Sequence, residues 1–107
     1  MQRYFHATKI SNIFSIRKQG LKPIWDYIYL TDTLDSACKW MGPAFSALGE
    51  AGFAVVEVEM ESDKLKNGID HSPIMEKLFG VGKSLTYDKV IPPKKIIEIH
   101  FFSINKK

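Results

Sequence analysis

The stretch from Phe53 to Met60 constrains the fold most, because it is apolar at its start and apolar and acidic residues alternate from Val56 to Met60. Successive side chains of an extended strand point to opposite faces, so the period of two predicts a strand in a sheet. Glu57 and Glu59 share one face. They are either a carboxylate pair suited to acid–base chemistry or the solvated side of a half-buried strand. The large apolar residues of the other face are Val56, Val58 and Met60.

The first 31 residues predict a strand, a helix and a second strand. The aromatic-rich segment Arg3 to Thr8 suits a strand. Helical spacing follows from Ser11, a good N-cap, to Gln19, and Gly20 is typical of a left-handed helix end. Tyr27 to Thr31 is the second strand. The two strand ends bear polar side chains that predict a pocket: His6, Thr8, Tyr29 and Thr31.

The next segment predicts a second helix and a loop. Asp32 or Thr33 caps this helix, which carries apolar residues at core spacing and is expected to stop at Gly42–Pro43. The small-residue-rich segment from Ala44 to Gly52 is expected to be a loop over the pocket.

The C-terminal half adds mostly strands. Asp63 to Gly68 is read as a turn or a single helical loop, Ile74 to Phe79 as a short helix, and Ser84 to Val90 and Ile96 to Ile104 as strands. The whole chain then holds five or six strands and two or three helices, which predicts an α+β sheet fold. At 107 residues the chain is expected to be one domain, 1–107.

Composition and charge limit the partners and the cell compartment that we expect for this chain. A net charge of +3 and a pI near 9.0 are compatible with an anionic partner such as a nucleotide. The single Cys38 cannot form an internal disulfide and is read as an inert thiol in a reducing compartment. The N-terminus lacks the apolar core of a signal peptide, and no apolar run reaches the ~20 residues of a membrane span. These features predict a cytoplasmic protein without a membrane partner.

Two chemistries receive little support from residue spacing. His6, His71 and His100 lie far apart without metal-ligand spacing, so no metal site is predicted. Gly80 to Lys83 resembles a phosphate-binding loop only faintly, because the full eight-residue spacing is missing.

Four motifs of the first half together resemble the ADP-ribosyltransferase superfamily, in particular its small prokaryotic or phage members. The most similar branches are the tRNA 2′-phosphotransferase-like proteins and the DNA-targeting toxins. Two later segments, Ala54 to Glu59 and Val90 to Ile96, are similar to the central strand and to the entry of the last strand in such proteins. The four motifs are Tyr4–Thr8 (YFHAT), Ser11–Ile16 (SNIFSI), Gly20–Pro23 (GLKP) and Ile28–Thr31 (IYLT).

The resemblance implies a minimal fold with a split β-sheet core and a cleft that binds NAD in a bent conformation. In that cleft, His6 would hydrogen-bond the nicotinamide-side ribose or amide, with Thr8 supporting it. Tyr29 would stack on the nicotinamide ring. Thr31 would contact the cleft wall, and Asn12 would tie the adjoining loop or touch the ligand.

One group that the resemblance implies is missing. Many transferases of this superfamily carry a Glu on the strand before the last, where it stabilises an oxocarbenium-like state, and Ser84 falls near that position. A serine can hydrogen-bond but brings no negative charge. The predicted catalytic residues are therefore His6, Tyr29 and Ser84, with Glu57 or Glu59 as substitute carboxylates.

Three functions stay open. The first is an enzyme that uses NAD to ADP-ribosylate a protein or a nucleic acid. The second is a catalytically inactive module that binds NAD, ADP-ribose, a related nucleotide or a protein partner in the same cleft. The third is a small interaction domain in which the motifs are coincidental.

Overall fold

The computed structural model describes residues 2–23, 27–67 and 84–104, and these form an α+β fold, as predicted. The strands are β1 (Gln2–Thr8), β2 (Ile28–Thr31), β3 (Gly52–Met60), β4 (Lys66–Asn67), β5 (Ser84–Tyr87) and β6 (Ile96–Ser103). The helices are α1 (Ile13–Gln19) and α2 (Leu34–Ala47), and short 3-10 turns are η1 (Ile10–Asn12), η2 (Ser62–Lys64) and η3 (Pro93–Lys95). The predicted helix Ile74–Phe79, the Gly80–Lys83 loop and His71 lie outside the described residues.

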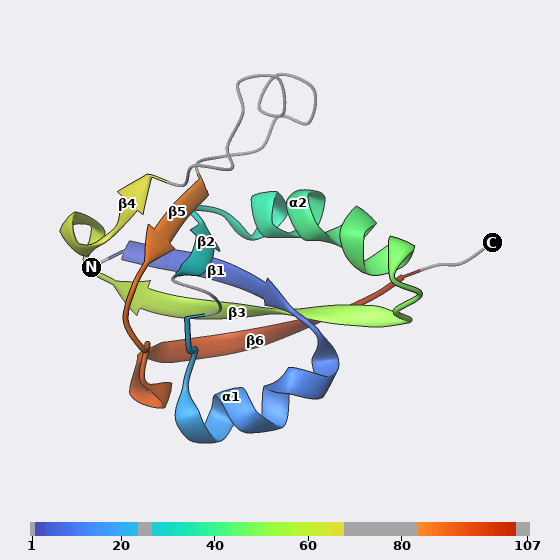
Figure 1. The fold of residues 1–107 in the computed structure, drawn as a ribbon, viewed down its shortest axis with the longest axis horizontal. Coiled ribbons are helices and arrows are strands. Elements are labelled where there is room, and N and C mark those ends of the chain that lie inside the picture. The colour runs from blue at the N-terminus through green and yellow to red at the C-terminus, as the bar shows by residue number, and fades with distance from the viewer. Residues whose placement is uncertain (1, 24–26, 68–83, 105–107) are drawn as a thin grey trace.

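The strands form one antiparallel sheet in the order β4-β5-β2-β1-β3-β6. Its two halves are joined weakly in the middle. β1 pairs with β3 from Gln2 to Thr8, but it pairs with β2 only at Phe5 and Thr31. The sheet therefore consists of a β4-β5-β2 half and a β1-β3-β6 half that meet at a single register position (Figure 1).

The two helices cover opposite faces of the sheet (Figure 1). α1 and the segment after it pack on the face that presents Val56 and Val58, whereas α2 packs on the face that presents Phe53 and Val55. The first core consists of Tyr4, Ile13, Ile16, Leu21, Ile28, Leu30, Ala54, Val56, Val58, Met60 and Ile91. The second consists of Ala37, Phe45, Phe53 and Val55, with Phe5, Leu34, Phe102 and others at its margin.

The first helix ends as predicted but begins differently. Gly20 closes α1 with φ 80° and donates its N–H to the carbonyl of Ile16 across 2.7 Å. The predicted N-cap Ser11 is wrong, because Ser11 lies within η1 and Asn12 precedes α1. Asn12 makes no side-chain capping bond. Its side chain contacts the end of β1 instead.

The second helix runs further than predicted. Thr33 is its cap, and the Thr33 hydroxyl accepts a 3.0 Å hydrogen bond from the N–H of Ser36. The expected stop at Gly42–Pro43 is wrong, and so is a loop beginning at Ala44, since α2 continues to Ala47. Phe45 explains the continuation: its buried ring stacks on Phe53 with 5.4 Å between centroids, which offsets the backbone bond that a helical proline removes.

β5 and β6 follow the prediction with shorter bounds, whereas the segment predicted as a turn, Asp63 to Gly68, contains the end of η2 and the short strand β4 within its described residues. β5 ends at Tyr87, before the predicted Val90, and Ile91 then forms an isolated bridge with Leu21. β6 spans Ile96–Ser103 on the outer side of β3. Among the described residues, no helix is long and apolar enough to cross a membrane.

Candidate functional site

The strands that carry the predicted site residues are neighbours, in the order β5-β2-β1. The register places Ser84 opposite Thr31 and Thr31 opposite Phe5. The same lateral row continues into the other half of the sheet, where Phe5 pairs with Glu57 and Glu57 with Glu98. One row thus crosses five strands and the junction between the two halves.

His6 holds the junction where the β1–β2 ladder ends. Its Nδ1 lies 2.8 Å from the carbonyl oxygen of Tyr29. A carbonyl oxygen only accepts, so Nδ1 carries the proton and donates it, which leaves Nε2 of the neutral ring as an acceptor. Burial lowers the pKa of His6 from its usual 6.5, and the bond to Tyr29 opposes that shift in part. His6 is therefore neutral at pH 7, and Nε2 can accept a hydrogen bond.

The predicted site side chains leave the sheet on two faces. Thr31 is the cross-strand partner of Phe5 and so shares its face, together with Tyr29. Alternation along β1 places His6 and Thr8 on the opposite face. The structure therefore brings His6 to the backbone of Tyr29, while the Tyr29 ring, 40% exposed, belongs to the face of α2.

Three predicted binding residues make local ties. The Asn12 amide donates to the hydroxyl of Thr8 across 3.0 Å, which fastens the start of α1 to the end of β1. Thr8 is buried. The Thr31 hydroxyl donates to the carbonyl oxygen of Thr33 across 2.8 Å, and so links β2 to the N-cap of α2. Of the two roles expected for Asn12, the observed contact is the loop tie.

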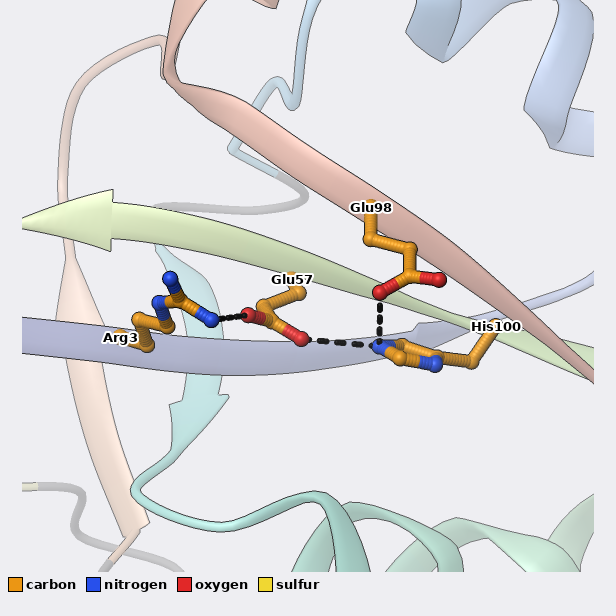
Figure 2. Close-up of polar contacts among 4 residues, drawn as sticks. All are labelled: Arg3, Glu57, Glu98 and His100. Atoms are coloured by element: carbon orange, nitrogen blue, oxygen red, sulfur yellow. Dashed lines mark hydrogen bonds and ion pairs between the residues drawn. The ribbon is translucent and has the colours of Figure 1, made fainter.

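A second constellation surrounds Glu57 (Figure 2). Glu57 is the partner of Phe5, which pairs with Thr31, so the cluster lies on the same face as Tyr29. Glu57 is buried, although a solvated face was one of the two readings of its pattern. One of its carboxylate oxygens accepts from Arg3 Nη1 across 3.0 Å, and the other lies 2.9 Å from His100 Nε2. The second carboxylate, Glu98, lies 3.8 Å from the same imidazole nitrogen. Glu59, the other predicted carboxylate, is half-buried and lies opposite Arg3 in the β1–β3 ladder, but the Arg3 side chain donates to Glu57.

Sequence reasoning missed this cluster because its members lie on three strands. Glu57 and Glu98 are direct cross-strand partners, and like charges opposite one another destabilise a sheet. Arg3 and His100 supply donors on both sides of Glu57. The sequence did show that Glu98 and His100 share one face of the last strand. Without the β3–β6 register, however, it could not show that this face lies next to Glu57.

The Glu57 cluster also holds the donor atoms that could ligate a cation. One ligand atom each of Glu57, Glu98 and His100 lie within 4.8 Å of one another. Carboxylate and imidazole are ligands of zinc and related metals. Arg3 already places a positive charge on Glu57, however, so the carboxylate is balanced by a donor of the chain itself.

Two hollows in the described part of the chain lie away from His6 and Tyr29. One of about 260 Å³ lies between α1 and β6, beside Arg17, Pro93 and Ile96–Ile99. The other, of about 80 Å³, is bordered by Lys64, Tyr87, Lys95 and neighbouring apolar residues. Cys38, half-buried, lines neither, and burial together with Asp35 raises the pKa of its thiol. This supports the reading of Cys38 as an unreactive thiol.

Comparison with known proteins adds no family. No protein-family model matches the chain, and no curated protein is significantly similar to it.

Proposed function

We propose that this chain is an ADP-ribosyltransferase-like module that binds NAD or ADP-ribose at the β1–β2 junction. The observation that carries the proposal is the split of the sheet at one register pair, Phe5 and Thr31, with His6 bonded to the backbone of Tyr29 beside it. A split core with a His and a Tyr on its two central strands is what the sequence resemblance implied.

The chain offers a nucleotide one suitable group on each face of this junction. The Tyr29 ring is exposed enough to stack on a planar base or nicotinamide ring. The Nε2 of neutral His6 accepts a hydrogen bond from a ribose hydroxyl, since Nδ1 is held by the backbone. A bound NAD would supply an activated glycosidic bond. A reducing, NAD-containing compartment such as the cytoplasm of a prokaryotic or phage-infected cell fits the single cysteine.

Binding of NAD without transfer of ADP-ribose is supported by the contacts that the carboxylate of Glu57 already makes. One oxygen of Glu57 accepts from Arg3 and the other lies 2.9 Å from His100 Nε2, so a ligand hydroxyl would compete with donors of the chain itself for Glu57. The strand position of the missing Glu is occupied by Ser84. Transfer to a protein or a nucleic acid is the second candidate, favoured by the register that places Glu57 two strands from Thr31, roughly 10 Å away at usual strand spacing.

Binding is tested by thermal shift and calorimetry with NAD and with ADP-ribose. A ligand at a hundredfold its dissociation constant adds about 2.7 kcal/mol of stability. We expect either His6→Asn or Tyr29→Ala, according to the face of the sheet that the ligand occupies, to weaken binding at least about tenfold. Phe14→Ala is the matched control, because Phe14 is an exposed aromatic ring on α1. No shift with either ligand would favour the interaction-domain reading instead.

Transfer is tested separately with labelled NAD and a cell lysate. Label that enters protein or nucleic acid with the wild type, and is lost in Tyr29→Ala but kept in Phe14→Ala, identifies a transferase. Binding without label transfer identifies the inactive module.

A further inference from the structure

The outer edge of β6 is long and apolar. β6 is the terminal strand of the sheet order, and within residues 2–23, 27–67 and 84–104 no strand pairs with its outer side. It contains neither Lys nor Pro, two residues with which edge strands usually resist pairing. Ile97 and Phe101 are 39% and 53% exposed. Such an edge favours pairing with another strand.

Exposed apolar side chains concentrate around this edge. The described residues contain eight exposed large hydrophobic side chains, and four of them lie on β6 or on η1 and α1. Phe101 and Ile99 lie on the sheet face of α1, opposite Ala54 and Val56, and Ile97 lies at the bulge beside them. The hollow of about 260 Å³ runs along Ile96–Ile99 between α1 and the edge. This side of the molecule can therefore receive further apolar groups. The four side chains are Ile10, Phe14, Ile97 and Phe101.

The β3–β6 ladder determines which backbone groups of the edge are free. The N–H of Ile104 bonds to the carbonyl of Ala51 across 2.9 Å, so residues two and four positions earlier in β6 also face β3. Ile99 and Phe101 consequently point their N–H and C=O groups outward. A register shift opposite Glu57 and Val58 leaves Ile97 as the extra residue of a bulge, which ends the regular edge there.

We infer that the chain forms a two-fold dimer through antiparallel pairing of β6 with β6 of a second copy, centred on Ile99. A residue whose backbone N–H and C=O point away from β3 must pair with a residue of the second copy whose backbone groups point the same way. Only a few registers meet this condition. A centre at Glu98 opposes two carboxylates, and a centre at His100 opposes two imidazoles. Only the Ile99 centre places Glu98 opposite His100 of the second copy, and it brings Phe101 next to the bulge at Ile97.

This pairing brings the exposed apolar side chains and the charged side chains of the β6 edge into contact with the second copy. Phe101 of the second copy lies beside the hollow bordered by Ile97 and Ile99, and the two Ile99 side chains meet on the axis. Glu98, whose side chain is 65% exposed, gains an imidazole partner across the axis. Because the contact is two-fold, it occupies the β6 edge of both copies and stops at a dimer.

The mass in solution tests the dimer, by sedimentation equilibrium over a dilution series from low to high micromolar protein. We expect the wild type to reach twice the chain mass. Phe101→Lys should weaken the dimer at least about tenfold, since each substitution acts twice across the axis. Leu48→Lys, at a side chain 67% exposed and outside β6, should leave it unchanged. A monomer throughout the series, or equal effects of the two variants, would overturn the proposal.

Single cysteines test the register in a Cys38→Ser background. Ile99→Cys should cross-link two chains under mild oxidation, because a hydrogen-bonded antiparallel pair has Cα atoms about 5.5 Å apart, within disulfide reach. Glu98→Cys and His100→Cys report the two competing registers and should stay uncross-linked. Preferential cross-linking of either control would overturn the Ile99 centre, and circular dichroism of each variant shows that the fold is kept.

Discussion

The imidazole of His6 donates to the backbone carbonyl of Tyr29 across 2.8 Å, at the point where β1 and β2 part. Beyond the Phe5–Thr31 pair the backbone ladder is absent, and a side chain supplies the bond. His6 thus stabilises the junction and presents Nε2 beside it. His6→Asn separates the two roles. Asparagine keeps a donor near the Nδ1 position, but it has no Nε2 and it does not titrate.

His6 should make folding stability depend on pH. Burial lowers its pKa in the folded protein below 6.5, so the unfolded chain binds the proton more readily between the two pKa values. The stability that His6 contributes is present above pH 6.5 and falls as pH decreases through that window. Urea denaturation from pH 7.5 to 4.5 measures it. His6→Asn should flatten the decline, and identical pH profiles for the two proteins would contradict this account.

Gly20→Ala should destabilise the protein far more than Gly49→Ala. Both glycines have positive φ, at 80° and 81°, so both substitutions bear a left-handed backbone cost of about 1–2 kcal/mol. A Cβ at Gly20 would also lie 2.0 Å from the carbonyl oxygen of Ile91, whereas at Gly49 it meets nothing within 4 Å. We expect Gly20→Ala to cost about 3 kcal/mol or more in denaturant unfolding. Equal losses at the two sites would show that the close approach is unimportant.

Glu57→Ala should cost about 2–3 kcal/mol, because it leaves His100 and Arg3 without their shared acceptor at a buried position. Glu59→Ala on the same strand is the control and should cost less, since Glu59 is half-buried and lies outside the cluster. Chemical denaturation of both variants provides the comparison. A Glu57 variant as stable as the control would mean that the cluster is energetically neutral.

Phe45→Ala should lower stability by about 3–5 kcal/mol and shorten α2. Phe45 is buried, stacks on Phe53, and lies beyond Pro43, where the helix has one fewer backbone donor. Far-ultraviolet circular dichroism and hydrogen exchange at Ala44 to Ala47 report the loss of the last turn. Leu48→Ala, at an exposed position, should change stability by less than about 0.5 kcal/mol, and full protection of that turn in Phe45→Ala would refute the explanation.

Local pattern was enough to predict most elements. The alternation of Val56–Met60 determines both the strand and the core face of Val56 and Val58, because a period of two is that of an extended strand and not of a helix. Gly20 marks the end of α1 because a positive φ is cheap only for glycine. These features depend on neighbours in the chain, and the α+β class follows from them.

Contacts between distant residues decided the rest. The continuation of α2 past Pro43 depends on the ring of Phe53, which no local propensity encodes. The burial of Glu57 depends on Arg3 and His100, 54 and 43 residues away in the sequence. The sequence by itself determined which residues could form strands and polar strand ends. Only the tertiary structure decided their register, because a one-residue slip moves every side chain of a strand to the other face.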